Sequence, residues 1–451
     1  MKRIDTDILI LGAGWSGLVA ADLLSSRGRK VVILEKETEV GGLARTFNFR
    51  GFKFDLGGHC LFFKDMEDVR YIKNIISNGN IMGLRRKTKV FFDNKYIDYP
   101  PNLYSILKLG KKYLPKILSD MVILNKNYGN DNFENWVKTN YGETLYRIYF
   151  KDYTEKVWGE SCDNISVAWA DKRIGKNNLL KIIKKIFLNG GYNKYDKRRF
   201  YYPRDGIGTL ASALEQRIKK NNCLVYKGVK LNQISMNNGK PAFSSFVYEK
   251  NMYEIEFNQL ISSIPILELY KILPHEIASD IQEPIKGIKY RNLICINFII
   301  NKNLVTNWHW CYFPTKDIIF SRLHEPKFWS KSLAPENKTL ICAEVFCSND
   351  DLYWNMKEEE LIKRVENAMK YSEVISDRGI IQDAMVKKIE YTYPLHYNGF
   401  EKPLNQIKRV FSNFNNFHTV GRSGKHSYFD MEECLKDACQ TVNFIMEKNE
   451  K

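Results

Sequence analysis

Three glycines near the start of the chain have the spacing of a phosphate-binding turn. Gly12, Gly14 and Gly17 form a G-x-G-x-x-G pattern directly after the apolar run 7–11. In such a pattern the first glycine permits a tight turn, the second lets the backbone approach a pyrophosphate, and the third lets helix and strand pack closely. The following helix N-terminus favours phosphates. Glu35 ends the next apolar run, where it can accept from ribose hydroxyls, so the stretch predicts a dinucleotide site.

Two more glycine pairs precede side chains that could contact a cofactor. The pair at 41–42 comes shortly before Arg45, an arrangement that can wrap a phosphate or a flavin with the arginine as cation. The pair at 57–58 comes directly before His59, which would bring backbone close to a flat group and direct an imidazole toward it. The alternative for His59 is a loop histidine whose hydrogen bonds the protein itself satisfies.

A second anion-binding corner is predicted at the opposite end of the chain. The G-R-x-G sequence at 421–424 follows a strand-like run and precedes a helix that begins near Asp430. Glycines at a helix N-terminus again favour a phosphate or another anion. Two such fingerprints, so far apart in sequence, indicate a chain that returns to the same ligand.

The elements that must position these residues read as an α/β fold. Residues 7–35 form a βαβ unit, with a helical stretch between two buried strands. An alternating segment around Asp93 and Asn94 predicts a hairpin. Residues 103–125 have a helical period with lysines on one face, which suits a substrate-cap helix or, alternatively, a helix on a membrane surface. The apolar run 290–300 predicts a strand of a second sheet.

Composition limits the class of protein. At 451 residues the chain suits one large or two interwoven domains. It has no apolar run of roughly eighteen residues that could cross a bilayer, and no signal-peptide pattern. Nine cysteines without a C-x-x-C predict reduced thiols in a cytoplasmic protein and no metal site. The 69 basic and 52 acidic residues give a net charge of +17, which suits an anionic partner, although no nucleic-acid module is visible.

Several stretches resemble one flavoenzyme superfamily. The run LEKETEVGGLART at 34–46 is similar to the FAD-binding segment of amine oxidases, protoporphyrinogen oxidases and UDP-galactopyranose mutases, and 421–433 resembles their second FAD fingerprint. This resemblance selects FAD over a nicotinamide cofactor. Similarity to the pyranose mutases in particular lies in the G-G-H loop at 57–59, K-V-W at 156–158, W-x-x-x-R-I at 169–174 and Y-x-Y-P at 391–394.

The resemblance implies a Rossmann-like FAD-binding domain of the amine-oxidase type, interwoven with an α+β substrate domain that has an antiparallel sheet and a helical cap. The expected parts are an FAD-binding first part (1–98), a helical cap (99–200), an FAD-binding second part (201–266), a substrate-domain sheet (267–408) and an FAD-binding C-terminal part (409–451).

The resemblance also implies roles for individual residues. Arg173 and Arg322 would bind the diphosphate of a nucleotide sugar and, with His59, form the catalytic set. The alternatives are packing for the block around Arg173 and an ion pair with Glu325 for Arg322. The further substrate-binding residues would be Trp158, Tyr391, Tyr393 and Tyr428. The cofactor-binding residues would be Gly12, Gly14, Trp15, Ser16, Gly17, Glu35, Lys36, Gly42, Leu43, Arg45, Gly57, Gly58, His59, Val229, Gly421, Arg422, Phe429, Asp430 and Met431.

The function that the resemblance implies is a UDP-sugar mutase that interconverts pyranose and furanose rings for capsular or surface polysaccharide. Reduced flavin N5 would attack the anomeric carbon of UDP-galactopyranose or of a pentose such as UDP-arabinopyranose. The alternatives are an FAD-dependent oxidase or desaturase of an amine, porphyrinogen or polyprenoid, and a non-enzymatic binding protein. A mutase needs an external reductant such as NADPH or a flavin reductase. The sequence leaves a homodimer and a peripheral membrane contact open.

Overall fold

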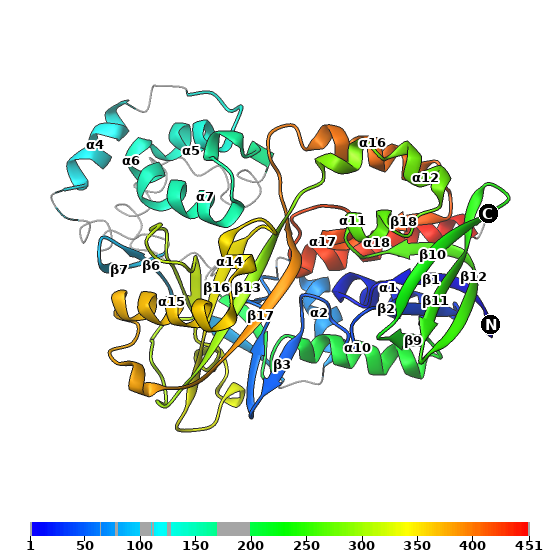
Figure 1. The fold of residues 1–451 in the computed structure, drawn as a ribbon, viewed down its shortest axis with the longest axis horizontal. Coiled ribbons are helices and arrows are strands. Elements are labelled where there is room, and N and C mark those ends of the chain that lie inside the picture. The colour runs from blue at the N-terminus through cyan, green and yellow to red at the C-terminus, as the bar shows by residue number, and fades with distance from the viewer. Residues whose placement is uncertain are drawn as a thin grey trace.

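The computed structural model describes residues 2–63, 65–76, 80–99, 110, 112–123, 128–168 and 199–449. The predicted phosphate ligand Arg173 lies outside these residues, as do 103–109, 111 and 124–125 of the basic segment 103–125 and all but the last residue of the segment 176–199. Two sheets organise the described chain, and both termini lie at the end of the molecule formed by the first sheet (Figure 1).

The first sheet has seven strands and contains the predicted βαβ unit. In spatial order they are β10 (Lys230–Asn237), β11 (Lys240–Tyr248), β12 (Asn251–Ser262), β1 (Lys2–Leu11), β2 (Val31–Glu35) and β9 (Leu224–Lys227), and β18 (Phe417–Thr419) also pairs with β12. Strands β12, β1, β2 and β9 are parallel, whereas β10 to β12 form an antiparallel meander. A parallel strand that is covered on both faces has apolar residues at nearly every position, which explains why β1 and β2 are continuous apolar runs in the sequence.

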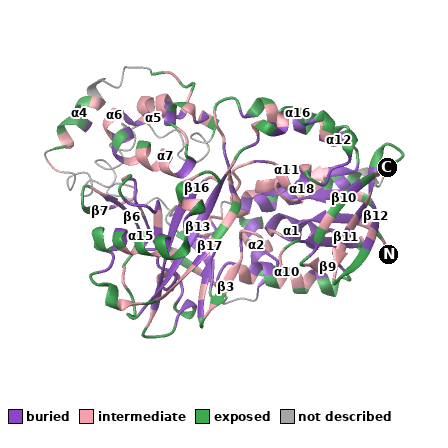
Figure 2. Cartoon of the chain, in the orientation of Figure 1, coloured by how far each residue is buried: buried purple, intermediate pink, exposed green. Residues whose placement is uncertain are grey.

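Alternate residues of β1 face two different hydrophobic cores. Ile8 and Ile10 pack with α1 (Trp15–Ser25), α10 (Gly208–Lys220) and α18 (Met431–Asn449). Leu9 and Leu11 face the other side, where the cover consists of α11 (Ile266–Tyr270), α12 (His275–Asp280) and α16 (Glu401–Ser412). Side chains along a strand alternate between the two faces of its sheet, so one short segment links both layers. Figure 2 shows the buried residues following this sheet.

The second sheet also has seven strands and is largely antiparallel. Their order is β17 (Ile381–Pro394), β13 (Tyr290–Ile300), β16 (Thr339–Cys347), β15 (Arg322–His324), β14 (Trp310–Tyr312), β6 (Thr88–Phe92) and β7 (Lys95–Asp98). The hairpin β6–β7 confirms the predicted turn, because Asp93 and Asn94 have positive φ angles of 51° and 55°. Such angles suit the tight turns of two-residue hairpins.

Helices cover both faces of this second sheet. Ile294, Ile296 and Phe298 of β13 belong to the core beneath α14 (Leu352–Asn355) and α15 (Glu358–Tyr371). Leu293 and Cys295 face the helical group at the upper left of Figure 1. That group comprises α4 (Leu114–Ile123), α5 (Phe133–Tyr141), α6 (Glu143–Leu145), a π-helix (Tyr146–Lys151) and α7 (Asp152–Trp158).

Smaller elements connect the two halves. They are the hairpin β3 (Thr46–Phe49) and β4 (Phe52–Asp55), the pair β5 (Ile81–Arg85) and β8 (Arg199–Pro203), and the helices α2 (Met66–Ile75), α13 (Pro326–Trp329) and α17 (Gly421–Gly424). The predicted α/β class, with one parallel and one antiparallel sheet, is confirmed. The domain boundaries stay a prediction. Residues 88–98, assigned to the first FAD-binding part, supply the edge of the second sheet, and α11, α12 and α16, assigned to the substrate-domain sheet, cover the first sheet. No helix within the described ranges is long and apolar enough to cross a membrane.

Candidate functional site

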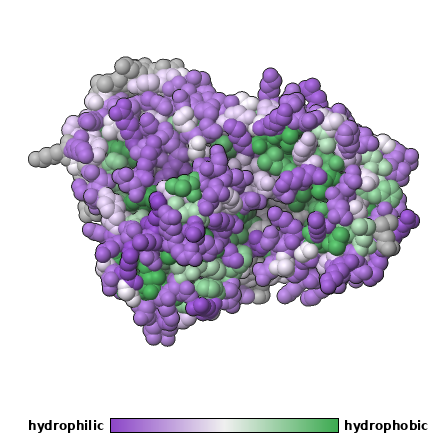
Figure 3. Space-filling view, viewed as in Figure 1, coloured by the Kyte–Doolittle hydropathy of each residue, from purple (hydrophilic) through white to green (hydrophobic). Residues whose placement is uncertain are grey.

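A cleft of about 1550 Å³ is lined by residues from both sheets and from the helical group. Most of the face seen in Figure 3 is polar, and apolar side chains appear on it in separate patches. The cleft contains one end of β1, the start of α1, the loop after β4, strand β15 and the turn before α18. Residues from the beginning, the middle and the end of the chain therefore meet in one cavity.

The three glycines of the first turn meet three different constraints. Gly12 has a φ of 93°, which side chains rarely adopt. A Cβ at Gly17 would lie 2.1 Å from the carbonyl oxygen of Gly12, so no side chain fits between turn and helix. Gly14 has an ordinary φ of −68°, and a Cβ there would meet only the Cα of Gly42, at 3.9 Å. Gly14 lines the cleft, so a Cβ at this position would project into space that is open to a ligand.

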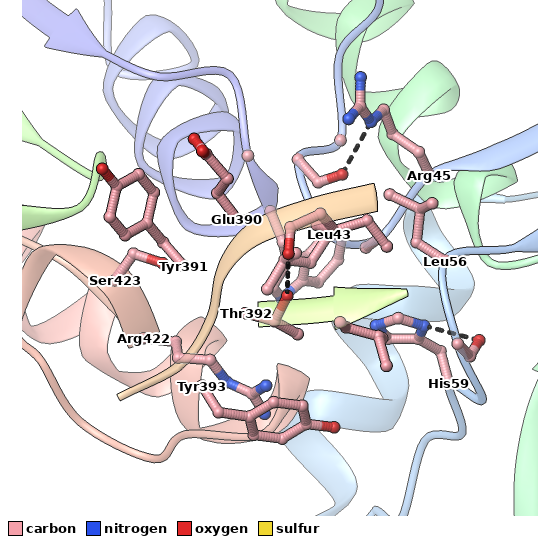
Figure 4. A pocket seen from close by; sticks show the side chains of 18 of the residues that line it. Leu43, Arg45, Leu56, His59, Glu390, Tyr391, Thr392, Tyr393, Arg422 and Ser423 are labelled. Atoms are coloured by element: carbon pink, nitrogen blue, oxygen red, sulfur yellow. Dashed lines mark hydrogen bonds between the residues drawn. The ribbon is translucent and has the colours of Figure 1, made fainter. Parts of the chain in front are cut away.

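Acidic and basic groups border this turn. The carboxylate of Glu35 accepts from the backbone N–H of Ala13 at 2.7 Å and of Glu37 at 2.9 Å, which holds it at the wall of the cleft. Burial raises the pKa of Glu35. The Nε of Arg45 donates to the carbonyl of Gly42 at 2.8 Å (Figure 4), and its Nη1 lies 3.2 Å from Glu37.

The two predicted fingerprints are in direct contact. The indole N–H of Trp15 donates to the carbonyl of Met431 at 2.9 Å, so the start of α1 is bonded to the start of α18. Gly421 has a φ of 78°, and a Cβ there would lie 2.2 Å from the hydroxyl of Ser16. Phe429 and Asp430 line the cleft beside these helix ends. The N-termini of α1 and α18 thus border one cavity, which fits an anionic cofactor.

The G-G-H loop is anchored by Asp55, a residue that sequence reasoning missed. The Asp55 carboxylate accepts from the hydroxyls of Thr46 and Tyr202, both at 2.6 Å, and from the N–H of Ile207 at 3.2 Å. Burial raises the pKa of Asp55 to about 6. The loop is therefore fixed to the returning chain at the end of β8. An acid two residues before a glycine pair was the available signal.

His59 lines the cleft as a neutral imidazole. Its Nδ1 lies 3.3 Å from the carbonyl of Gly57 (Figure 4). Burial, with the nearby charges of Arg422 and Arg322, lowers the pKa of His59 to about 4. At neutral pH this side chain offers a hydrogen-bonding nitrogen to the cleft without adding a charge.

Arg322 is held by Glu344, whereas Glu325 was the acid considered from sequence. The Nε and Nη2 of Arg322 donate to Oε1 and Oε2 of Glu344 at 2.9 and 2.6 Å. Glu325 instead accepts from the backbone of Val305 and the hydroxyls of Thr306 and Thr339. The predicted alternative was wrong in its partner because β15 pairs with β16 and places Arg322 opposite Glu344.

Glu344 also ties Arg322 to the G-G-H loop. Its Oε1 accepts from the N–H of Gly58 at 3.0 Å, and His324 Nδ1 lies 3.2 Å away. Burial alone would raise the pKa of Glu344, but Arg322 and His324 outweigh it and hold this pKa at about 2. Sequence reasoning assigned Glu344 no role. An acid within the apolar run of β16 was the signal that could have identified it.

Arg322 stands in a row of paired residues across the second sheet. Glu344 pairs with Arg322, Arg322 with Tyr312, and Tyr312 with Val90, on four neighbouring strands. Directly paired residues point to the same face of a sheet. Arg322, Tyr312 and Val90 line the cleft, so this face of the sheet forms one of its walls.

Three predicted residues form an aromatic–cation cluster at one end of this wall. The rings of Tyr393 and Tyr428 stack with centroids 5.3 Å apart, and the Arg422 guanidinium lies 5.1 and 5.0 Å from their centroids. Arg422 Nε also donates to the carbonyl of Phe429 at 2.7 Å. Trp158 packs against both tyrosines, but it is 2% exposed and does not line the cleft. It supports the cluster from behind.

Tyr391 is directed away from this cluster. Strand β17 is irregular between Ile389 and Tyr393, and Tyr391 has a φ of 55° there. A β-bulge re-aims side chains by breaking the alternation of the strand. The Tyr391 hydroxyl donates to Glu268 at 2.9 Å, and Figure 4 shows Tyr391 and Tyr393 on opposite sides of the chain. Tyr391 borders another part of the cleft.

The cleft brings together most of the predicted site residues. Those that line it are Gly12, Gly14, Trp15, Ser16, Glu35, Lys36, Gly42, Leu43, Arg45, Gly57, Gly58, His59, Val229, Arg322, Tyr391, Tyr393, Arg422, Tyr428, Phe429, Asp430 and Met431. Gly17, Trp158 and Gly421 are buried behind its wall. Sequence reasoning did not identify Arg86, Tyr99, Tyr149, Trp310 and Tyr312, which also line it. Among the residues described, no cluster of His, Cys, Asp and Glu could hold a metal ion.

Comparisons with known proteins agree with this geometry. Residues 10–72 match the model of an NAD(P)-binding Rossmann-like domain, and residues 174–441, more than half of the chain, match that of the flavin-containing amine oxidoreductases. A crystal structure of reduced UDP-galactopyranose mutase has the same fold, with a TM-score of 0.84 at 20% identity over 98% of this chain and 94% of that chain.

Two named relatives differ in their chemistry. The all-trans-retinol 13,14-reductase of Danio rerio is 33% identical over 116 residues, which are 25% of this chain and 19% of that protein. The dTDP-fucopyranose mutase of Escherichia coli is 25% identical over 273 residues, 56% of this chain and 66% of that protein. This chain thus spans about a fifth of one relative and about two thirds of the other, and neither activity extends to it on similarity alone. With its two joined fingerprints and its family match, the protein belongs to the flavin-containing amine oxidoreductase family and binds FAD.

Proposed function

We propose that this protein is an FAD-dependent nucleotide-sugar mutase that interconverts pyranose and furanose rings. The supporting observation is an oriented arginine beside the G-G-H loop: Glu344 holds both Arg322 and the Gly58 N–H. A guanidinium fixed at that position can bind a diphosphate whose attached sugar lies over the flavin. The substrate is a UDP-sugar, either UDP-galactopyranose or a pentose analogue such as UDP-arabinopyranose.

The protein's part in this reaction is to hold the leaving diphosphate and to position the sugar. Reduced FAD supplies the nucleophile for the anomeric carbon, and the overall reaction is redox-neutral. Two of the Arg322 nitrogens are bonded to Glu344, and Nη1 makes no bond to any described residue. That nitrogen, together with the hydroxyls of Tyr393 and Tyr428, would bind phosphate oxygens. Arg173 is proposed as the second cation. Neutral His59 would hydrogen-bond beside the flavin.

A second candidate is a flavin oxidoreductase, which the retinol reductase relative favours. The lining of the cleft argues against a hydrocarbon substrate. Beyond the cofactor end, Arg86, Arg322 and several tyrosines line the cavity. Burying such groups against a polyprenoid would leave them without hydrogen bonds, at a cost of about 1–3 kcal/mol each.

Anaerobic turnover separates the two functions. Dithionite-reduced protein is incubated with UDP-galactose or UDP-arabinopyranose, and products are resolved by anion-exchange chromatography and mass spectrometry. A new peak of unchanged mass, formed by reduced but not by oxidised protein, supports the mutase and distinguishes hexose from pentose. Absence of conversion, together with flavin reduction by retinoid-, amine- or porphyrinogen-type substrates, would contradict it.

The two tyrosines of the Y-x-Y-P element are expected to differ in this assay. Tyr393→Phe removes a hydroxyl beside Arg422 and Tyr428, and we expect about a tenfold loss of kcat/KM, the worth of one lost hydrogen bond to a charged group. Tyr391→Phe removes a hydroxyl that already donates to Glu268, so activity should stay within about twofold of wild type. Steady-state kinetics of both variants test this. Equal losses of kcat/KM in Tyr393→Phe and Tyr391→Phe would mean that the bulge does not give the two tyrosines different roles.

The remaining features of the proposal follow from the same reaction. The reduced cofactor requires an external reductant such as NADPH or a flavin reductase. Synthesis of capsular or surface polysaccharide would consume the furanose product. We place the protein in the cytoplasm, where nucleotide sugars are made, and treat a homodimer and a peripheral membrane contact as open to measurement.

A further inference from the structure

The cleft continues past Arg322 into a region that the proposed diphosphate site does not use. This region, the donor pocket, is formed by Arg86, Tyr99, Tyr149, Trp310 and Tyr312. Tyr312 is the direct pairing neighbour of Arg322, and Trp310 precedes it by two residues on the same face of β14. The rings of Tyr99 and Tyr312 meet edge to face with centroids 5.7 Å apart. The donor pocket therefore adjoins the proposed reaction site.

Arg86 brings to this pocket a positive charge that no carboxylate of the described residues pairs with. Arg322 is paired with Glu344, whereas Arg86 forms no ion pair with a carboxylate of the described chain. Burial raises the pKa of Tyr312 to about 12, and the positive charges of Arg322 and Arg86 act in the opposite direction. Arg86 also opposes the rise that burial causes in the pKa of Tyr99. Arg86 and both tyrosines line the same cleft, and the tyrosines lie within the electrostatic range of its charge.

Two buried polar groups in the donor pocket have no hydrogen-bond partner within the described part of the chain. Trp310 is 6% exposed, and its indole N–H, although near Tyr312, makes no hydrogen bond of normal geometry. The hydroxyl of Tyr149 is likewise buried and unpartnered. A tryptophan N–H and a guanidinium can only donate, and tyrosine hydroxyls can donate as well as accept, so donors outnumber acceptors in the pocket. Buried donors left unpaired are costly and call for a ligand atom that accepts.

The position of Arg86 assigns this pocket to the sugar end of the ligand. Arg86 lines the same cleft as His59 and Cys60, and its charge opposes the rise that burial causes in the pKa of Cys60, the residue directly after His59 in the flavin loop. The Tyr393 cluster lies on the other side of Arg322. Strand β17, which carries Tyr393, and strand β6, which begins two residues after Arg86, lie on opposite sides of β15 in the order of the second sheet. The diphosphate and the group facing Arg86 are therefore on different sides of Arg322.

We infer that the donor pocket binds an acidic group on the sugar, so that the preferred substrate is a nucleotide sugar bearing a carboxylate. A carboxylate accepts only, carries one negative charge for Arg86, and can be shared by a guanidinium, an indole N–H and a tyrosine hydroxyl. A sugar hydroxyl would match the donors without matching the charge. This inference rests on the proposed mutase function and replaces the neutral sugars named there with an acidic sugar as the preferred substrate.

The test compares three ligands on the FAD-loaded protein. Dissociation constants for UDP, UDP-galactose and UDP-galacturonate are measured anaerobically from the change in flavin absorbance, for wild type, Arg86→Gln and the control Arg85→Gln. Arg85 is the exposed neighbour of Arg86 at the end of β5. We expect wild type to bind UDP-galacturonate at least about tenfold more tightly than UDP-galactose, the gain of one charge-assisted bond. Arg86→Gln should abolish this preference and change UDP affinity less than about threefold.

The outcomes separate this inference from the proposed function. Equal affinity of wild type for both sugars would overturn the carboxylate assignment while leaving the mutase intact. If Arg86→Gln weakens the binding of UDP itself as much as it weakens the binding of UDP-galacturonate, the carboxylate assignment is also overturned, because Arg86 would then bind the diphosphate. Absence of binding by UDP itself would contradict the mutase proposal and this inference together. Arg85→Gln should match wild type for all three ligands.

Discussion

Glu344→Gln is expected to lower kcat/KM for ring interconversion by about a hundredfold, although Glu344 does not line the cleft. The substitution removes the charge that orients Arg322 and leaves a buried guanidinium facing an amide. Losing one member of a buried pair costs about 3–5 kcal/mol, some of it as stability. Glu344 is a positioning residue, so its substitution should lower the affinity of the protein for the diphosphate.

Three measurements distinguish this positioning from general destabilisation. The affinity for UDP alone should fall in Glu344→Gln, and Arg322→Gln should lose UDP affinity to a similar extent. The double variant should lose no more than the worse single one, because both substitutions remove one coupled unit. Glu390→Gln provides the matched control: Glu390 lines the cleft but forms no ion pair with a described residue, and its activity should stay within about twofold. Unchanged UDP affinity in Glu344→Gln would refute the assignment.

The pair also predicts a pH dependence of its stabilising effect. Because the folded pKa of Glu344 is about 2, below its ordinary value of 4.5, the folded state favours the ionised carboxylate. The stabilisation is complete above pH 4.5 and is lost as the pH falls through about 2. The difference in unfolding free energy between wild type and Glu344→Gln should narrow across that window.

The second large effect separates two glycines of the same motif. Gly14→Ala is expected to fold as the apoprotein but to bind FAD about a hundredfold more weakly, a loss of roughly 2.7 kcal/mol. A Cβ at Gly14 meets no protein atom closer than 3.9 Å and projects where the backbone should approach the pyrophosphate. Gly17→Ala should impair folding itself, because its Cβ would lie 2.1 Å from a backbone oxygen.

Thermal unfolding of the apoproteins and titration with FAD check these two expectations. Gly14→Ala should unfold within a few degrees of wild type without cofactor and show the deficit only in the titration. Gly17→Ala should give little soluble protein, or a much lower unfolding temperature. Gly28→Ala at the end of the same helix is a control for FAD affinity but not for stability, since its Cβ meets no atom within 4 Å while its φ of 78° strains a side chain. Full FAD binding by Gly14→Ala would contradict the role assigned to this glycine.

The sequence alone determined the features that depend on short segments. The order of strand, glycine turn, helix and acid over residues 7–35 identified the dinucleotide unit, because positive φ angles and apolar periods are local properties. Asp93 and Asn94 determined a hairpin for the same reason. Resemblance within such segments was sufficient to identify the family and FAD.

Only the tertiary structure decided which distant side chains became partners. Arg322 is three residues from Glu325 in sequence, yet it pairs with Glu344 because β15 lies beside β16. A bulge in β17 turned Tyr391 toward Glu268, and the stacking of Tyr393 on Tyr428 left Trp158 behind the wall. Arg86 became a cleft residue because β6 lies beside β14. Each outcome depends on the pairing and register of strands far apart in sequence, which no local pattern encodes.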